Sequence, residues 1–434
     1  MKRFVVQTRL SDVREAAGIA CLVALGAVTV GACADSERAD DQAIRTDSAG
    51  VSMVHYPSLP SLEESRFVLS PEPDLIIGRE GAEPAYEFFR IAGVARLSDG
   101  SLVVANAGTH ELRFFDADAQ FLGSTGGRGE GPGEFRGIRG LWVTQGDSLI
   151  VWDEGGRTLN LFSPGGEYVR SARVGTTPFN DYLQQPRLLG ILRDGRVATF
   201  LASINVMMPS GPQRYPQLLA FTALDDEQWD SIRVTRGAEV SIEPHSTNPA
   251  WTVIINTTFG ASSIASAASA TVALVDTEDF RIELYNTYGQ LSKIISAALP
   301  DIPVTTGMLD PHIDSLIEQS FPNMSDQDRG PFRERIRSQP LASVLPKIRA
   351  VIVDSADRIW VERYDEPGSH ASRWEVFERD GTWIGRIEMP YGFVRFSGGA
   401  PALVADEEQV TGVWVDPETG IETVRVHRIR QHAP

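Results

Sequence analysis

Cysteine is nearly absent from this sequence of 434 residues, which contains only Cys21 and Cys33. Both lie in the first 33 residues, so the remainder of the chain cannot form an internal disulfide and is not a disulfide-stabilised scaffold. Basic residues are also in deficit, with 40 Lys and Arg against 58 Asp and Glu, a net charge of −18. Such an acidic chain repels phosphate backbones and anionic lipid headgroups, so we expect no nucleic-acid partner.

Sequence motifs of common enzymes are missing as well. There is no Gly-Lys pair, which excludes a Walker motif, and no Gly-x-Ser-x-Gly nucleophile elbow. The pair His110-Glu111 begins a zinc-protease pattern, but Phe114 stands where the second histidine belongs. The glycines between 126 and 133 are interrupted by Pro132 and precede no helix start, so they predict a turn. The sequence motifs therefore indicate no catalytic residue.

The N-terminus has the features of an export signal. Four basic residues at positions 2, 3, 9 and 14 precede an uncharged apolar stretch from Ala16 to Val30. About fifteen apolar residues are too few to span a bilayer, which takes about twenty, but suit the core of a signal peptide. We expect residues 1–32 to be removed, which leaves 36 basic and 56 acidic residues and a net charge of −20.

The stretch Val30-Gly31-Ala32-Cys33 resembles the lipobox of bacterial lipoproteins. This resemblance implies lipidation of Cys33, so that the mature chain is held at a membrane by its acyl chains. Ala34 follows where an aspartate often signals retention in the inner membrane, so the outer membrane is favoured. The alternative is an ordinary secretory signal with an incidental cysteine.

The segment after the lipobox is polar and acidic up to about Ser48. Its composition cannot bury enough apolar surface to fold alone, so residues 33–62 are predicted to be an acidic tether. Within it, Val51 to His55 is compatible with a short strand.

A repeat dominates the rest of the chain. A strand that ends in Asn106 is followed six residues later by Leu112 and three residues after that by Phe115. The same spacing recurs in two further triplets, Asp153, Leu159 and Phe162, and Asp276, Ile282 and Tyr285. Turns rich in Asp, Asn, Gly or Pro follow each aromatic residue, as antiparallel hairpins require.

Six such units can be counted from the residues that end the third strand of each: Phe115, Phe162, Phe221, Tyr285, Phe377 and Val426. Their spacing predicts an all-β fold, a β-propeller of six four-stranded antiparallel blades over residues 63–434. The last unit ends after three strands, and the segment near Arg66 to Ile77 has no unit of its own. We expect that N-terminal segment to supply the missing strand and close the ring.

The stretch from Val104 to Phe115 (VANAGTHELRFF) resembles the NHL-repeat consensus. Residues 126–135 are similar to the inter-blade linker of bacterial six-bladed propeller lipoproteins. The resemblance covers most of residues 63–434 but weakens in the third unit, after Arg193-Asp194-Gly195. It supports the fold and the lipid anchor together.

Residues 301–348, between the fourth and fifth units, form an insertion that does not follow the strand pattern. One helix is predicted to begin at Asp310-Pro311 and a second to run from Asp326 to Ser338. The insertion joins the last strand of one blade to the first of the next, so it emerges on the face that also carries the loops between second and third strands. The insertion is either a lid over a binding site or an addition that only packs against the propeller.

Candidate site residues come from those loops, and two functions remain open. The first is a binding or scaffold module for an unknown protein or small molecule, with no cofactor, through His110, Arg128, Arg157, Asn106, Asp153 and Asp276. The second follows from related propeller lactonases, which hold a central divalent ion; it implies calcium or zinc on Asn106, Asp153 and Asp276. For His110 and the two aspartates, a structural role in the turns is the alternative.

Overall fold

The computed structural model describes residues 43–79, 81, 83–144, 146–174, 186–202, 209–226, 228–244, 252–320, 324–367, 372–390, 392–394, 396–397, 400–401, 403–416 and 418–431. All of them belong to one compact unit that begins at Arg38. The predicted signal peptide, residues 1–32, and Cys33 lie outside the described residues. Within the described part of the chain, no helix has the length and apolar character needed to cross a membrane.

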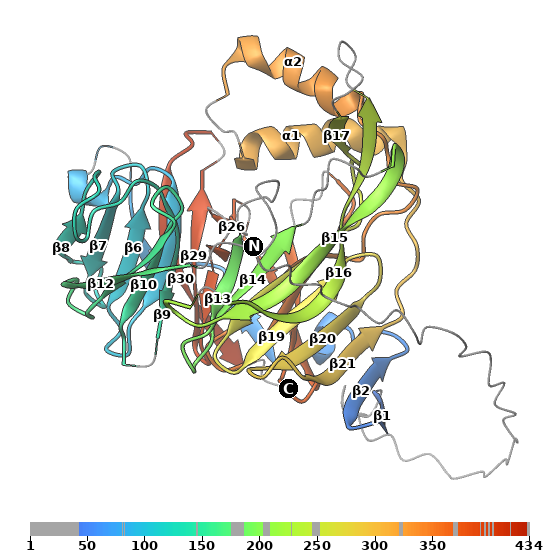
Figure 1. Ribbon diagram of the computed structural model, residues 1–434, viewed down its shortest axis with the longest axis horizontal. Coiled ribbons are helices and arrows are strands. Elements are labelled where there is room, and N and C mark those ends of the chain that lie inside the picture. The colour runs from blue at the N-terminus through green and yellow to red at the C-terminus, as the bar shows by residue number, and fades with distance from the viewer. Residues whose placement is uncertain are drawn as a thin grey trace, which may run out of the picture. The chain divides into compact units, whose positions relative to one another are not determined.

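Antiparallel sheets make up most of the molecule (Figure 1). Sheet 1 contains β5 (Ile91–Arg96), β6 (Leu102–Asn106), β7 (Glu111–Phe115) and β8 (Phe121–Gly126). Sheet 2 contains β9 (Ile138–Val143), β10 (Leu149–Asp153), β11 (Thr158–Phe162) and β12 (Tyr168–Arg173). Sheet 3 contains β13 (Arg187–Ile191), β14 (Val197–Ala202), β15 (Gly211–Thr222), β16 (Asp230–Pro244) and β17 (Thr252–Asn256).

The second half of the chain repeats this arrangement. Sheet 4 contains β18 (Ser263–Ala268), β19 (Thr271–Asp276), β20 (Arg281–Asn286) and β21 (Leu291–Ala297), with β2 (Val51–Tyr56) and β1 (Ile44–Ser48) added at its outer edge. Sheet 5 contains β22 (Ile348–Val353), β23 (Ile359–Arg363), β24 (Ser372–Phe377) and β25 (Trp383–Met389). Sheet 6 contains β28 (Leu403–Ala405), β29 (Gln409–Val415) and β30 (Glu422–Gln431), followed by β3 (Phe67–Leu69) and β4 (Leu75–Ile77).

The sequence repeat corresponds to one sheet. The second strand ends at Asn106 in sheet 1, Asp153 in sheet 2 and Asp276 in sheet 4, as the spacing predicted. The six marker residues lie on the third strands of the six sheets, and all are buried: Phe115, Phe162, Phe221, Tyr285, Phe377 and Val426. The repeat in the sequence therefore arises because each sheet buries a large side chain on its third strand.

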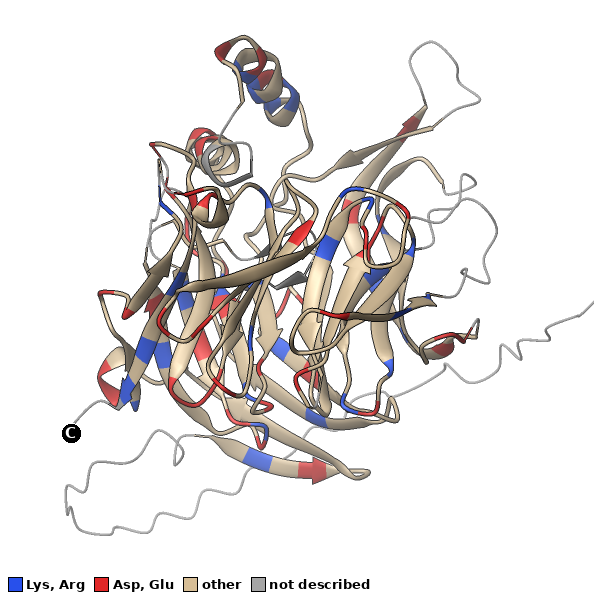
Figure 2. Cartoon of the chain, turned by 90° about the vertical axis from the view of Figure 1, so that its left-hand side faces the viewer, with Lys and Arg blue, Asp and Glu red and all other residues tan. Residues whose placement is uncertain are grey.

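Two helices, α1 (Leu309–Ser320) and α2 (Asp326–Arg337), occupy the insertion between sheets 4 and 5, where the sequence predicted them. Their buried residues Ile313, Ile317, Phe332 and Ile336 form an apolar cluster of their own. Ion pairs between Arg337 and Asp310, at 2.8 Å, and between Arg333 and Asp314 join the helices, and Figure 2 shows both charge signs on them.

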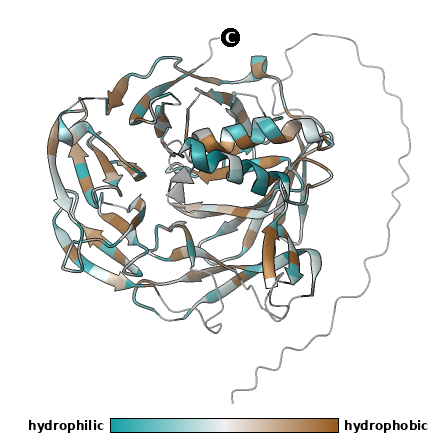
Figure 3. Ribbon diagram, turned by 90° about the horizontal axis from the view of Figure 1, so that it is seen from above, coloured by the Kyte–Doolittle hydropathy of each residue, from teal (hydrophilic) through white to brown (hydrophobic). Residues whose placement is uncertain are grey.

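Apolar clusters join each sheet to the next. One unites sheets 1 and 2 around Phe135, others unite sheets 2 and 3, 3 and 4, 4 and 5, and 5 and 6, and the last returns from sheet 6 to sheet 1 around Val424. The sheets therefore surround a common centre, as the view from above shows (Figure 3). This closed arrangement of packed meanders is a β-propeller.

The N-terminal segment closes the ring on sheet 6, as predicted, but with two short strands instead of one. β3 pairs with the end of β30 through Val68 and Arg430, and β4 pairs with its middle through Ile76 and Arg425. The pairing covers an edge that β30 would otherwise expose to water.

Part of the segment predicted to be a tether is folded. Within residues 33–62, β1 and β2 form a hairpin, and β2 pairs in parallel with β21 from Ser52 to Tyr56. Val54 and Tyr56 are completely buried, and the Tyr56 hydroxyl donates to the Gly381 carbonyl oxygen at 2.9 Å. The acidic composition of the segment gave no indication that Val54 and Tyr56 would be buried.

Sheet 3 departs most from the repeat. β15 and β16 are 12 and 15 residues long, and β17 pairs with the far end of β16. Pro212 and Pro216 lie in β15, and a register shift between Arg214 and Pro216 accommodates the second of them. These irregularities explain why the period was lost here.

Candidate functional site

Asn106 and Asp153 are engaged within their own loops. Asn106 is fully buried; its Oδ1 accepts from the Phe89 backbone N–H at 2.9 Å, and its Nδ2 donates to Thr109 Oγ1 at 3.0 Å. The carboxylate of Asp153 accepts from the backbone N–H groups of residues 136 and 137, at 2.7 Å for the shortest. Both side chains thus close the loop before the first strand. For Asp153 this is the structural role that the sequence analysis gave as the alternative.

Asp276 also ends the second strand of its sheet, sheet 4, but its carboxylate forms ion pairs with two arginines. Arg214 Nη1 donates to it at 2.9 Å and Arg236 Nη2 at 2.8 Å, while Glu278 approaches Arg236 at 2.9 Å. The negative charge of Asp276 raises the pKa of Arg236. This ion cluster ties the long strands of sheet 3 to sheet 4.

His110 and Arg157 occupy the same turn position in sheets 1 and 2, directly before the third strand. Both have left-handed backbones, with φ of 61° and 54°. The carbonyl oxygen of His110 accepts from the Gly127 N–H at 2.8 Å, and Arg128 follows on the exposed surface. His110 Nδ1 is buried without a hydrogen-bond partner among the described residues. These residues shape the turns of the loop face.

The residues present do not fit the central ion that the lactonase alternative implied. Calcium takes six to eight oxygen ligands, and zinc needs at least three protein ligands. The side chains of Asn106, Asp153 and Asp276 are each committed to backbone amides, a hydroxyl or arginines. Over the ranges that the structure describes, no group of three His, Cys, Asp or Glu lies close enough to hold a metal ion.

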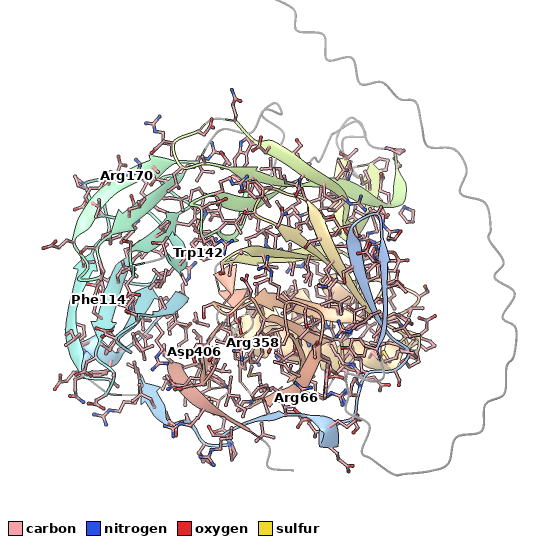
Figure 4. The ribbon with its side chains drawn as sticks, turned by 90° about the horizontal axis from the view of Figure 1, so that it is seen from below. Arg66, Phe114, Trp142, Arg170, Arg358 and Asp406 are labelled. Atoms are coloured by element: carbon pink, nitrogen blue, oxygen red, sulfur yellow. The ribbon has the colours of Figure 1, made fainter. Side chains whose placement is uncertain are left out.

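A short hairpin crosses the centre of the ring. The first strands lie nearest the centre: viewed from below, Trp142 of β9 is closer to it than Arg170 of β12 (Figure 4). The hairpin of β26 (Phe396–Ser397) and β27 (Ala400–Pro401) interrupts the start of sheet 6 and lies against β5, β9 and β13. It therefore reaches from sheet 6 to the opposite sheet 3, a feature that the sequence pattern did not reveal.

The helix pair is held by a hydrogen-bonded stem, which we define as residues 302–304 and 343–345. Val304 donates to the Ser343 carbonyl at 3.0 Å, and Leu345 donates to the Ile302 carbonyl at 2.9 Å. Among the described residues, no sheet residue belongs to the apolar cluster of the helices. The pair is thus a small folded unit on its own support.

Thr258, between β17 and β18, fixes the far end of this support. Its N–H donates to the Pro340 carbonyl at 2.7 Å, its carbonyl accepts from Ala342 at 3.0 Å, and its hydroxyl donates to Gln339 Oε1 at 2.9 Å. The three bonds set where the helices stand over the loop face.

Aromatic rings form the contact between α1 and that face. The ring of His312 lies 4.6 Å from the ring of Phe259, which meets Tyr364 edge-on at 6.4 Å. The guanidinium of Arg349 lies over the Tyr364 ring, 5.5 Å from its centroid. Desolvation, with a smaller effect of Arg349, lowers the pKa of His312 to about 4. The histidine is therefore neutral at pH 7 and packs as an aromatic ring.

We expect this contact to weaken in acid. A histidine in the unfolded chain has a pKa near 6.5, so between pH 6.5 and 4 the unfolded state binds the extra proton and unfolding is favoured. The wild type should lose up to about 3 kcal/mol of unfolding free energy over this range relative to His312→Phe. Urea unfolding at pH 7, 5.5 and 4 measures this; His55→Gln, at an exposed histidine, is the control. Parallel losses in the wild type and His312→Phe would refute it.

Comparisons with known proteins identify no family. No family model matches the sequence, and no curated protein matches it. Among solved structures, the chain is similar to a putative exported protein from Bacteroides fragilis (11% identity, TM-score 0.44, 88% of this chain and 100% of that chain). It is also similar to a DUF4221 family member from Bacteroides vulgatus (10%, 0.49, 85% and 99%) and to regucalcin, a calcium-binding protein from Agrobacterium tumefaciens (11%, 0.35, 80% and 93%). At these scores the assignment as a β-propeller depends on the chain's own sheets.

Proposed function

We propose that this chain is an exported, lipid-anchored binding module of the cell envelope, built on a six-bladed propeller. The six sheets are its blades, and the loop face beneath α1 and α2 holds the ligand. One observation carries the binding role: the helix pair has its own core and a three-bond anchor at Thr258, so the ring does not need it for its packing. The helix pair is held over the loops but, among the described residues, adds none to the cores between the sheets. Loops and attached elements that a rigid scaffold positions in this way commonly carry binding sites.

Deletion of the helix pair tests this function. In the variant, Asn-Gly joins Val304 directly to Ser343, whose backbones are already hydrogen-bonded, so a two-residue hairpin turn can connect them. We expect the Tm of the variant to stay within about 5 °C of the wild type, because the cores between sheets are untouched. In a thermal-shift screen of small molecules, ligands should stabilise the wild type and not the variant. Equal stabilisation of both would place the binding site elsewhere.

The lipid anchor has a separate test. The basic leader, the short apolar stretch and the lipobox-like residues before Cys33 support it. Among the described residues, the first strand begins at Ile44, 11 positions after Cys33. We expect radiolabelled palmitate to enter the full chain in bacteria, and Cys33→Ser to abolish the label and release the protein from membranes. Cys21→Ser, within the signal segment, is the control. Equal labelling of Cys33→Ser and the wild type would show that Cys33 is not the site of lipidation.

A further inference from the structure

Ser70 holds the N-terminal strands against β30. It follows β3 directly; its backbone N–H donates to the Arg428 carbonyl at 2.8 Å, and its hydroxyl accepts from the Arg428 N–H at 3.0 Å. Four residues later, the Asp74 N–H donates to the Val426 carbonyl at 2.8 Å. Residues 67–77, which we call the closing segment, are therefore attached to β30 at both of their strands and at the turn between them.

A histidine takes part in the same attachment. His427 is fully buried, and its Nδ1 donates to the Ser70 carbonyl oxygen at 2.8 Å. Because a carbonyl can only accept, Nδ1 carries the proton of the neutral imidazole and Nε2 is left as an acceptor. Nε2 is buried and has no hydrogen-bond partner among the described residues. This environment therefore suits an imidazole with one proton and offers no acceptor for a second.

Apolar residues surround the imidazole on the side of sheet 5. Side chains alternate along a strand, so His427 and Ile429 share one face of β30, and Ile429 belongs to the apolar cluster between sheets 5 and 6. The ring of Trp414, on β29, lies 5.1 Å from the imidazole. On β25, Ile387 joins the same cluster, so the charged residues on either side of it in the sequence, Arg386 and Glu388, face the other way.

The charges that act on the imidazole come from β30 and from the closing segment. Burial is the largest effect and lowers the pKa of His427; Arg425 lowers it further, while the Ser70 carbonyl, Asp74 and Glu72 oppose the change. If the closing segment separates from β30, the imidazole meets water and its pKa returns to about 6.5. The separated state then binds the second proton more readily, so its population rises as the pH falls below about 6.5.

We propose that His427 makes closure of the ring sensitive to acid, so that its protonation releases the closing segment from β30 while the six sheets stay folded. β3 and β4 have three residues each, so their release breaks few hydrogen bonds compared with unfolding of the domain. The β1–β2 hairpin is held by sheet 4 and stays in place. Release uncovers the edge of β30 from Val424 to Val426, which β4 covers in the closed ring.

Hydrogen exchange of the chain from residue 38 onward, followed by mass spectrometry at pH 7.5, 6 and 5 and corrected for the intrinsic rate at each pH, tests the proposal. Protection of peptides within residues 67–77 should fall several-fold between pH 7.5 and 5. At each pH it should also lie below the protection of peptides from sheets 2 and 3. Exchange of the closing segment should depend weakly on urea, because a partial opening exposes little surface.

Two substitutions remove the titration and keep different parts of the contact. His427→Asn keeps a donor for the Ser70 carbonyl, and His427→Phe keeps an aromatic ring beside Trp414. Whatever their protection at pH 7.5, neither variant should lose protection of residues 67–77 in acid. Glu72→Gln removes an exposed carboxylate that favours the imidazolium, so the acid effect should grow.

His55→Gln, at an exposed histidine, and His312→Phe, at the buried histidine beneath α1, are the controls and should keep the acid response of the wild type. The proposal is overturned if the wild type keeps its protection of residues 67–77 at pH 5, or if His427→Asn and His427→Phe lose it as the wild type does. It is also overturned if the closing segment exchanges no faster than sheets 2 and 3, since release would then require unfolding of the whole domain.

Discussion

Replacing Glu375 by alanine is expected to lower the free energy of unfolding by about 3–5 kcal/mol, because it leaves buried charges unpaired. Glu375 is fully buried in sheet 5. It accepts from Trp383 Nε1 at 2.8 Å and from Arg386 Nε at 2.8 Å, and Arg363 approaches it at 3.8 Å. Without the carboxylate, an indole N–H and two largely enclosed guanidinium groups lose their acceptor.

Urea denaturation of Glu375→Ala, Glu375→Gln and Glu388→Gln measures this effect. Glu375→Gln keeps one acceptor oxygen and should cost less than the alanine variant. Glu388 is exposed on the neighbouring strand β25, so its replacement should change the free energy of unfolding by no more than about 0.5 kcal/mol. A loss of less than about 1 kcal/mol for Glu375→Ala would show that the network does not stabilise sheet 5 as described.

Removal of the N-terminal strands is expected to prevent stable folding. A chain that begins at residue 79 lacks β1 to β4 and with them the buried side chains of Val54, Tyr56 and Ile77. Each such side chain contributes about 1.5–3 kcal/mol, and the total stability of a domain is only about 5–15 kcal/mol. The edge of β30 would also be exposed and prone to pair with other chains.

Three chains, beginning at residues 43, 57 and 79, separate the contributions. Thermal unfolding should be cooperative for the first, at a lower Tm for the second, which lacks only the β1–β2 hairpin, and absent for the third. A soluble chain from residue 79 with the Tm of the longest chain would show that the ring does not depend on these strands.

Much of the fold could be predicted because the repeat reflects packing. Phe115, Phe162 and Phe377 recur where each third strand enters the core, and turn residues set the hairpins between them. The hairpin β26–β27 could not be predicted, since four paired residues inside a first strand leave no period. The strand β2 was predicted, from Val51 to His55, but its hairpin with β1 and the burial of Val54 and Tyr56 were not, because the segment around them is acidic.

The candidate site was predicted less well than the fold. Position in the repeat predicted that Asn106, Asp153 and Asp276 end their second strands, which they do, but it could not show that backbone amides and arginines occupy their side chains.

Closure of the ring is the claim on which the loop face and its site depend, and a disulfide tests it most directly. The chain from residue 38 contains no cysteine, and Ile76 and Arg425 are direct partners in the pairing of β4 with β30. Directly opposed antiparallel residues have Cα atoms about 4.5–5.5 Å apart, within reach of a disulfide. Ile76→Cys with Arg425→Cys should therefore oxidise completely and raise the Tm, whereas Ile76→Cys with Thr423→Cys, two residues out of register, should stay reduced. Equal oxidation of both pairs, or oxidation of neither, would contradict the closed ring.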